Sequence, residues 1–222
     1  MSDTRNTTKE KKRWPTKDVM TQIYEQNFWG GPAFDFYSGI GSHDLKIIRP
    51  YIKIVSEFLA SFDSKLTVCD LGCGDFNVGL TLVEHTKQYN AVDIVPDLIK
   101  RNKKLFKNPN LEFFCLDISK DALPNADCVL VRQVLQHLSN NEIHLVLNNL
   151  KAYKYLIITE HLPEGDFVPN LDMVTGQGIR LKKNSGVILD KPPFDLNPVK
   201  KEELLRIQLD KGCLLTTFYQ FF

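Results

Sequence analysis

Residues 68–79 read VCDLGCGDFNVG, an apolar strand that ends in an aspartate and a glycine-rich turn. A strand that runs into such a turn is typical of the first unit of an α/β sheet, where doubly wound folds bind their ligands. The acid, Asp70, comes just before the glycines. The ligand at this turn is therefore expected to attract a carboxylate.

Several ligands compete for this turn. A phosphate-binding P-loop ends in Gly-Lys-Ser/Thr, whereas Gly79 is followed by leucine and threonine. A dinucleotide fingerprint needs glycine at position 77, which is asparagine, and Asp70 would repel a pyrophosphate. S-adenosylmethionine (SAM) carries an ammonium and a sulfonium group, so Asp70 attracts it, and Gly72 and Gly74 let the backbone approach. An ordinary tight turn is the remaining alternative.

Strands and helices alternate outward from this turn. Five apolar runs predict strands, at residues 66–71, 89–94, 111–118, 127–133 and 154–161. Three periodic segments predict helices between them, at residues 78–88, 97–106 and 140–150. The tail predicts two more strands, joined by a turn at Lys211 and Gly212. The pattern predicts an α/β fold with a Rossmann-like, doubly wound sheet that is mostly parallel, has an antiparallel edge and carries helices on both faces.

The N-terminal part precedes this alternation. Residues 1–13 are polar and lack an apolar period, which predicts a disordered tail. Two segments with helical spacing follow, at residues 15–28 and 44–61, with an aromatic, glycine-rich loop between them. Ser42 is the expected cap of the second helix. We expect residues 14–61 to form a cap over the ligand, within a single domain that spans 14–222.

The composition bears on partners and compartment. The chain of 222 residues has 28 basic and 27 acidic side chains, so no general field attracts nucleic acid or an anionic membrane. No apolar run approaches the roughly 20 residues that span a bilayer, and the N-terminus lacks a signal peptide's apolar segment. Five cysteines, an odd number, indicate reduced thiols. We therefore expect a cytoplasmic protein that binds neither nucleic acid nor membrane.

Two further acids end the next strands. Asp93 ends the second strand, where a carboxylate can accept hydrogen bonds from both ribose hydroxyls. Asp117 ends the third strand and can accept from the adenine amine, while Ile94 and Ile118 cover the faces of the ring. Any one of these acids alone could be a helix cap. Together with Asp70, they predict a nucleoside site that binds SAM as the cofactor.

Four strings add to this pattern: YSGIGS, CGDFN, VRQVLQHLS and PPFDL. With the run from 66 to 160, they resemble class I SAM-dependent methyltransferases, and most closely a bacterial group of which some members accompany sugar or surface-polysaccharide genes. The resemblance spans most of residues 28–200 and implies a seven-stranded sheet whose last strand is antiparallel. One departure is Phe76, where the superfamily often has a third glycine. We expect this side chain to shape the methionine end of the pocket.

The chemistry predicts where catalytic residues lie. Methyl transfer is a direct displacement, so the protein mainly aligns the acceptor and excludes water, and a hydroxyl acceptor also needs a general base. His137 and His161 follow the fourth and fifth strands, and His161 has the shorter path; either could instead pack or cap. Arg132 and Gln133 are expected to hold the methionine carboxylate or an acceptor oxygen. A salt bridge within the loop is the alternative.

The segment after the fifth strand, residues 161–198, is long, polar and punctuated by glycines, and such an insertion usually covers or builds a substrate site. Its expected contacts with a hydroxylated or anionic acceptor are Asn170, Asp172 and Arg180, with Tyr37 on the opposite side. A solvated surface loop is the alternative. Its KPPF string resembles a motif of amino methyltransferases but does not follow the fourth strand and begins with lysine, which disfavours nucleic-acid methylation.

These observations predict an enzyme, a SAM-dependent methyltransferase without a metal ion. Its expected substrate is a small hydroxylated acceptor, a sugar or surface-polysaccharide precursor, methylated on oxygen. A non-catalytic SAM-binding partner subunit and a methyltransferase of protein or nucleic acid are the alternatives. A nicotinamide-dependent oxidoreductase would share the fold, but Asp70 and the missing glycine at position 77 count against it.

Overall fold

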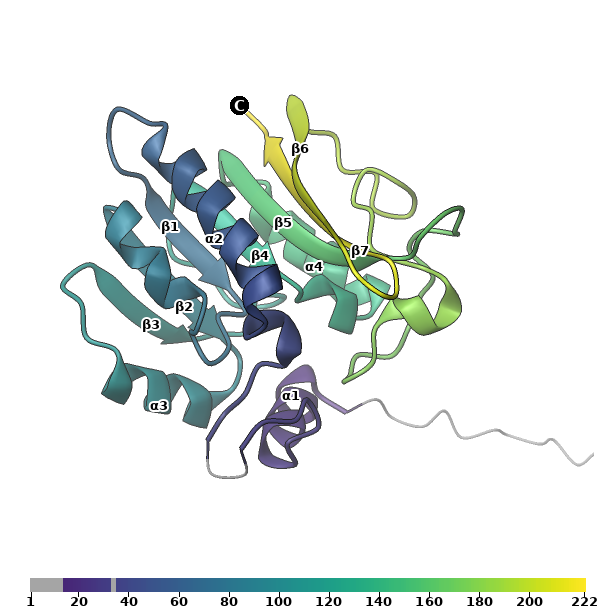
Figure 1. Cartoon of the computed structure of the whole chain (residues 1–222), viewed down its shortest axis with the longest axis horizontal. Coiled ribbons are helices and arrows are strands. Elements are labelled where there is room, and N and C mark those ends of the chain that lie inside the picture. Colours follow the sequence, from purple (N-terminus) through teal and green to yellow (C-terminus); the bar gives the residue numbers. More distant parts are fainter. Residues whose placement is uncertain (1–13, 33–34) are drawn as a thin grey trace, which may run out of the picture.

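The computed structural model describes residues 14–32 and 35–222, so the predicted tail at 1–13 lies outside the described residues. Its strands form one seven-stranded sheet (Figure 1) and are β1 (Thr67–Leu71), β2 (Gln88–Asp93), β3 (Leu111–Cys115), β4 (Cys128–Arg132), β5 (Tyr155–Leu162), β6 (Lys200–Gln208) and β7 (Cys213–Gln220). The order across the sheet is β3-β2-β1-β4-β5-β7-β6. The first five strands pair in parallel, and β7 pairs antiparallel with both β5 and β6. The predicted fold class is confirmed.

The central strands are buried on both faces. In β4, Val129 and Val131 belong to one core, whereas Cys128 and Leu130 belong to the other, as the alternation of side chains in a strand requires. The helix α4 (Asn140–Leu150) covers the first face and α2 (Leu45–Ala60) the second. Burial on both sides explains why these strands are continuous apolar runs in the sequence.

Two further helices complete the described chain's α-helical content, α1 (Thr16–Glu25) and α3 (Pro96–Leu105). The predicted cap of α2 is wrong. Asp44 caps this helix, because its side chain accepts a hydrogen bond from the backbone N–H of Lys46 at 2.8 Å. Ser42 instead ends a short 3₁₀ turn, η1 (Ile40–Ser42).

The helix expected at residues 78–88 does not form. Two 3₁₀ turns replace it, η2 (Gly79–Thr81) and η3 (Val83–His85). The hydroxyl of Thr81 donates to the carbonyl of Val78 at 2.7 Å, and that of Thr86 donates to Val83 at 2.8 Å. Such local bonds give the backbone an alternative to the α-helix.

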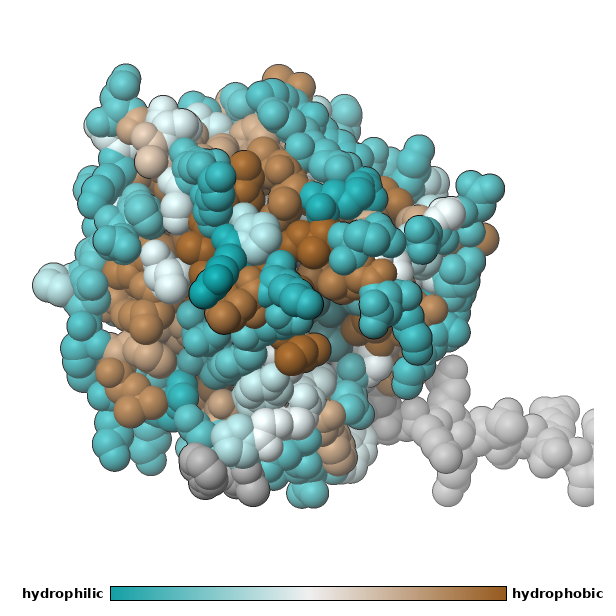
Figure 2. Space-filling model, viewed as in Figure 1, coloured by the Kyte–Doolittle hydropathy of each residue, from teal (hydrophilic) through white to brown (hydrophobic). Residues whose placement is uncertain are grey.

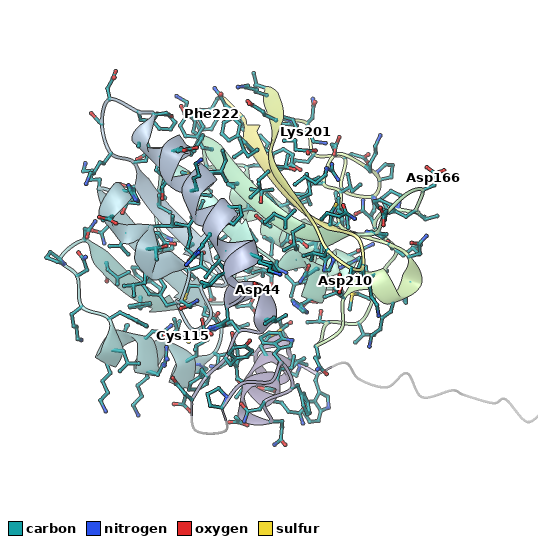
Figure 3. The ribbon with its side chains drawn as sticks, in the orientation of Figure 1. Asp44, Cys115, Asp166, Lys201, Asp210 and Phe222 are labelled. Carbon is teal, nitrogen blue, oxygen red and sulfur yellow. The ribbon has the colours of Figure 1, made fainter. Side chains whose placement is uncertain are left out.

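The C-terminal hairpin lies beside the insertion. Lys201 of β6, labelled in Figure 3, forms an ion pair with Asp190 of the insertion at 2.8 Å. The insertion contains one short 3₁₀ helix, η5 (Arg180–Lys183). Figure 2 shows the face that carries α2, on which hydrophilic side chains dominate the rim and hydrophobic ones show between them. No helix in the described part of the chain is long and apolar enough to cross a membrane.

Candidate functional site

A cavity of about 560 Å³ lies where the parallel strands end. Figure 1 shows α1 beside the carboxyl ends of these strands. Its floor comes from the sheet: the glycine turn after β1, the ends of β2, β4 and β5, and the loops after β3 and β4. Its remaining walls come from α1, the loop before α2, and the insertion. A site at the carboxyl ends of the strands is where doubly wound sheets bind ligands.

Most of the predicted site residues meet in this cavity. Those that line it are Asp70, Gly72, Gly74, Asp93, Ile94, Asp117, Ile118, Arg132, Gln133, His137 and His161. Four predicted substrate contacts do not line it: Tyr37, Asn170, Asp172 and Arg180. The strand ends therefore converge as expected, whereas the expected contacts from the two loops do not.

The glycine turn is closely packed by its neighbours. Gly72 has φ +80°, and a Cβ there would lie 2.3 Å from the side chain of Val134. Gly74 has φ +56°, and its Cβ would lie 2.3 Å from the hydroxyl of Ser38. Both positions require glycine because of their backbone conformation and because of this close approach.

Phe76 does not shape the cavity, which corrects the expectation for this side chain. It is fully buried, and its ring packs against Tyr89, Phe106 and Phe113 on the α2 side of the sheet. Its φ of +67° is the left-handed conformation that a glycine adopts readily. Phe76 thus keeps the backbone conformation of a glycine at this position, while its ring becomes part of the hydrophobic core.

Two of the strand-end acids are buried. Asp93 accepts hydrogen bonds from the backbone N–H groups of Gly74 and Val95, each at 3.1 Å, and burial raises its pKa despite these bonds. Asp70 accepts from the hydroxyl of Tyr89 at 2.9 Å, and burial raises its pKa to about 6. A buried carboxyl is costly unless it has partners, so a ligand that donates to these acids would stabilise them.

The third acid, Asp117, is only partly buried. Burial alone would raise its pKa, but hydrogen bonds from Lys120 and Ser119 together lower it. The distances are 2.7 Å from the Lys120 ammonium and 2.6 Å from the Ser119 hydroxyl. Cys115, labelled in Figure 3, is exposed two residues earlier at the end of β3, unlike the buried thiols. Asp117 thus holds the local turn with Ser119 and also lies in the cavity wall.

Asp75 is a site residue that the sequence reasoning missed. Its carboxylate accepts from the backbone N–H of Ser38 and contacts His43 Nε2, both at 2.7 Å. In return, the backbone N–H of Asp75 donates to the Ser38 hydroxyl at 2.8 Å. We call these three residues the latch, because they fasten the loop before α2 to the glycine turn. Its position directly after Gly74 of the glycine turn is the sequence signal that could have identified Asp75 as a site residue.

Arg132 is the last residue of β4 and contacts the loop before α2. Its guanidinium donates to the carbonyl of Gly41 and to the hydroxyl of Ser42, and it lies 5.0 Å from the ring centre of Tyr51. Burial lowers its pKa. Its buried Nε–H has no partner among residues 14–32 and 35–222. An anionic group of a ligand would satisfy this donor.

Gln133 follows Arg132 in a left-handed conformation, with φ +57°. Such a conformation costs energy in residues other than glycine and tends to occur at functional sites. A Cβ at Gly41 would lie 2.6 Å from the Gln133 amide oxygen, so this glycine leaves room for the side chain. The amide therefore stands in the cavity wall beside the loop before α2.

Both ring nitrogens of His137 are occupied. Nδ1 lies 3.2 Å from the carbonyl of Gly176, and Nε2 lies 3.4 Å from the amide nitrogen of Gln136. Because the carbonyl only accepts, Nδ1 carries the hydrogen, and Nε2 faces a donor. Burial lowers the pKa of His137 to about 4. The ring is neutral near pH 7, and its basic nitrogen is engaged by the protein.

His161 leaves one ring nitrogen without a partner. It lies within β5 and not after it, and its Nε2 lies 2.7 Å from the carbonyl of Lys211 in the turn between β6 and β7. This contact places the hydrogen on Nε2 and the lone pair on Nδ1, which has no partner in the described parts of the chain. Burial lowers the pKa of His161. A neutral ring with an unoccupied basic nitrogen can take a proton.

Gly212 explains how the turn reaches His161. This residue has φ +82°, and a Cβ there would lie 2.0 Å from the carbonyl oxygen of Leu162. The absence of a side chain lets the hairpin turn pack directly on the end of β5. The Lys211 carbonyl is thereby held against the histidine.

Arg180 is a structural clamp and not an acceptor contact. It is 1% exposed, and its guanidinium donates to the carbonyls of Leu135, Gln136 and Leu138 at 3.2, 3.3 and 2.7 Å. These carbonyls belong to the loop after β4, which includes the 3₁₀ turn η4 (Leu135–His137). Arg180 therefore fastens the insertion to the segment that carries His137.

The other three predicted acceptor contacts also have structural partners. Asn170 is buried, and its amide donates to the carbonyls of Ile188 and Pro192, while its oxygen accepts from the Ile188 N–H. Asp172 is exposed and accepts from the backbone N–H of Asn140 at the start of α4. Tyr37 stacks on the ring of a latch residue, His43, with centroids 4.4 Å apart. The insertion reaches the cavity through other residues, Gln177, Gly178, Ile179 and Lys182.

The sequence of the central segment matches a known family. Residues 68–153 match the model of a family described as a methyltransferase domain. This segment of the chain is therefore similar to a methyltransferase domain. The matched residues include the glycine turn, the strand-end acids and Arg132, which converge on the cavity. No curated protein matches the chain.

Solved methyltransferases share the fold. The N-methyltransferase NodS from Bradyrhizobium japonicum, in complex with S-adenosylhomocysteine (SAH), superposes with a TM-score of 0.62 at 14% identity, covering 91% of this chain and 99% of NodS. Magnesium protoporphyrin IX methyltransferase from Synechocystis, with bound SAM, gives 0.57 at 15% identity, covering 95% and 100%. Human N-acetylserotonin methyltransferase, in complex with SAM, gives 0.58 at 16%, covering 94% and 61%. The predicted enzyme class and cofactor, a methyltransferase that uses SAM, agree with the domain match and with these neighbours.

The cavity has the features that SAM requires. Two buried acids whose pKa is raised by burial, an arginine with an unpaired Nε–H, and two closely packed glycines all line one cavity. A ligand with hydroxyl and ammonium donors and one carboxylate complements this set. In the described residues, no three His, Cys, Asp or Glu side chains are grouped as metal ligands.

Proposed function

We propose that the protein transfers the methyl group of SAM to a hydroxyl of a small acceptor, a sugar or surface-polysaccharide precursor. The resemblance to a bacterial group linked with sugar genes supports the acceptor class. The observation that carries O-methylation is His161, which lines the cavity with Nδ1 unpaired while its other nitrogen is held 2.7 Å from the Lys211 carbonyl. A hydroxyl needs such a base, whereas a neutral amine does not.

The cofactor residues are assigned from their strand ends. Asp93 would accept from the ribose hydroxyls and Asp117 from the adenine amine, with Ile94 and Ile118 on the faces of the ring. Asp70 would balance the positive charge of the methionine end.

Arg132 would bind the methionine carboxylate through its unpaired Nε–H. When bound, SAM supplies a methyl group on a positively charged sulfur.

The chain's own residues would then do two things during the reaction. His161 Nδ1 accepts the hydroxyl proton as the acceptor oxygen becomes nucleophilic, and the Lys211 carbonyl stabilises the resulting imidazolium. Gln133 orients the acceptor oxygen with its amide. The loop before α2 and the insertion exclude water, because Gln177 of the insertion donates to the carbonyl of Phe28 across the cavity.

The wider setting is part of the proposal. A single domain with a cap at 14–61 and an insertion at 161–198 would act in the cytoplasm of a bacterium without nucleic acid or membrane as a partner. The near balance of basic and acidic residues supports this choice.

The neighbours named above act on varied molecules, so a protein acceptor, a nucleic acid acceptor and a non-catalytic SAM-binding subunit remain the competing functions.

The test uses SAM labelled in its methyl group, incubated with the protein and with fractions of a bacterial extract. Label in alkali-stable methyl ethers of small hydroxylated molecules supports the proposal. Label only in RNA, DNA or protein contradicts the acceptor class. Tight SAM binding by calorimetry without label in any fraction supports the non-catalytic alternative.

A further inference from the structure

One part of the cavity lies between the loop after α1 and the insertion. We call it the acceptor half, and its walls include Phe28, Trp29, His137, His161, Gln177, Gly178, Ile179 and Lys182. Contacts connect these walls directly: the rings of Trp29 and His137 are 5.2 Å apart, and Gln177 donates to the carbonyl of Phe28. These contacts hold the two sides of the acceptor half together. Its walls offer aromatic rings, the amide of Gln177 and the ammonium group of Lys182.

The charges of the cavity are distributed unevenly. Five carboxylates line it, from Asp70, Asp75, Asp93, Asp117 and Glu142. The first four lie at the glycine turn and the strand ends, which form the cofactor half. Their placement leaves Glu142 as the carboxylate nearest to the insertion.

Glu142 is occupied by the protein. Burial alone would raise its pKa, but hydrogen bonds from Ser139, Thr16 and Thr175 together lower it. It also completes the capping box at the start of α4, where a negative charge is favourable. Glu142 therefore stays ionised, and its oxygens are already occupied by hydroxyl and backbone donors of the protein.

Lys182 is the unbalanced charge. It lies on η5, is exposed, and has no ion pair or hydrogen-bond acceptor among residues 14–32 and 35–222. The neighbouring Lys183 differs, because its ammonium donates to the carbonyl of Asp172 at 2.9 Å. Arg180 fixes the start of η5 through its buried hydrogen bonds, so the backbone that carries Lys182 is held against the cavity.

We propose that the methyl acceptor is anionic, a hydroxylated molecule with a phosphate or carboxylate group, and that Lys182 binds this group. This inference rests on the proposed function and names its substrate class. Trp29 and Phe28 would pack against the body of the molecule, and the hydroxyl would face His161. The walls named for the acceptor half carry one ammonium and no carboxylate, which favours an anion over a neutral sugar.

The test measures binding without turnover. Glucose 6-phosphate, glucuronate and glucose are titrated by calorimetry into the protein saturated with SAH. Both anions, or one of them, are expected to bind about 10-fold more tightly than glucose. This preference is expected to disappear in Lys182→Gln and to persist in Lys182→Arg and in the control Lys183→Gln. The two anions distinguish a phosphate from a carboxylate.

Three results with the anions would overturn the inference, and one with SAH. The three are equal binding of glucose and both anions, no binding of either anion, and an anion preference that survives in Lys182→Gln. A loss of SAH affinity in Lys182→Gln would also overturn it, because Lys182 would then bind the cofactor. The proposed function fails separately: a protein that binds the anions through Lys182 but methylates nothing keeps the anion site and contradicts methyl transfer.

Discussion

The two halves of the cavity are built in different ways. The cofactor half stands on strand ends, where the parallel register places neighbouring ends side by side; Asp70 pairs with Ala91, and Asp93 pairs with Cys115. The acceptor half stands on loops that are fixed by side chains from distant parts of the chain, such as Arg180 and Gln177. Regular structure therefore positions the cofactor residues, whereas individual long-range contacts position the acceptor residues.

The largest expected effect separates the two histidines of the acceptor half. His161→Ala should lower turnover by about 10² to 10⁴, because it removes the base with the unoccupied nitrogen. SAM affinity should hardly change, since His161 is assigned to the acceptor. His137→Ala is the matched comparison and should cost much less turnover. The two variants are compared by steady-state kinetics with the real acceptor and by calorimetry with SAM.

The pH profile identifies the base independently. The base must be unprotonated, so kcat/KM should rise with pH through the pKa of the base and then stay level. Burial lowers the pKa of His161 below its ordinary value, which places this rise below about pH 6.5. A rise near pH 4 would instead point to His137, whose pKa is about 4. Near-normal turnover in both alanine variants would exclude histidine as the base.

The second prediction concerns the clamp that holds the acceptor half. Arg180→Met should lower the free energy of unfolding by about 3 kcal/mol, because it removes the guanidinium that donates to the carbonyls of Gln136 and Leu138. The control is Arg206→Met, which removes a pair with Glu203 whose side chains are both 48% exposed. That loss should stay below about 1 kcal/mol. Chemical denaturation measures the free energy of unfolding of both variants. Equal losses in the two variants would contradict the role of Arg180 as a clamp.

The third prediction tests the cofactor half. Asp93→Asn should weaken SAM binding by about 2 kcal/mol, since a neutral amide no longer accepts at both oxygens from the ribose hydroxyls. Asp97→Asn changes an exposed residue in the first turn of α3, four positions later, and should leave the affinity unchanged. Calorimetry measures both affinities. Unchanged SAM affinity in a folded Asp93→Asn would refute the assignment of this carboxylate.

The smallest expected effect is at the latch. His43→Gln removes the 2.7 Å contact with Asp75, but the Asp75 carboxylate keeps the N–H groups of Ser38 and Asn77. We therefore expect a loss of about 1 kcal/mol in stability and a similar or smaller loss in SAM affinity. Denaturation and calorimetry measure the two. A loss of SAM binding as large as that of Asp93→Asn would show that the latch belongs to the cofactor half.

Much of the fold could be predicted from the sequence, because apolar runs, glycine turns and strand-end acids are local signals. The parallel strands and the C-terminal hairpin were predicted in this way, whereas the order of the strands across the sheet was not. The segment at 78–88 could not be predicted in this way. Its apolar spacing suits a helix, and only the hydroxyls of Thr81 and Thr86, turned back to the backbone, show why the chain forms tight turns.

The candidate site divides along the same line. Asp70, Asp93 and Asp117 were predictable because a strand end fixes where a side chain goes. Arg180 was predicted to contact the acceptor because it is a charged residue in a polar insertion. Its guanidinium is instead buried and donates to carbonyls that lie over 40 positions away in the sequence. Lys182, two residues later, reaches the cavity instead. No local pattern separates these two residues, since tertiary contacts decide which cation is buried.

The place of β7 between β5 and β6 affects how the chain acquires its structure during synthesis. β6 leaves the ribosome before β7, but its hydrogen-bonded neighbour in the sheet is β7. Until residues 213–220 are available, β6 has no strand to join, and the outer edge of β5 stays unpaired. Unpaired edges favour association with other chains. The nascent protein is therefore expected to be most prone to aggregation just before its final strand is added, which a translation-arrest series ending between β6 and β7 would reveal.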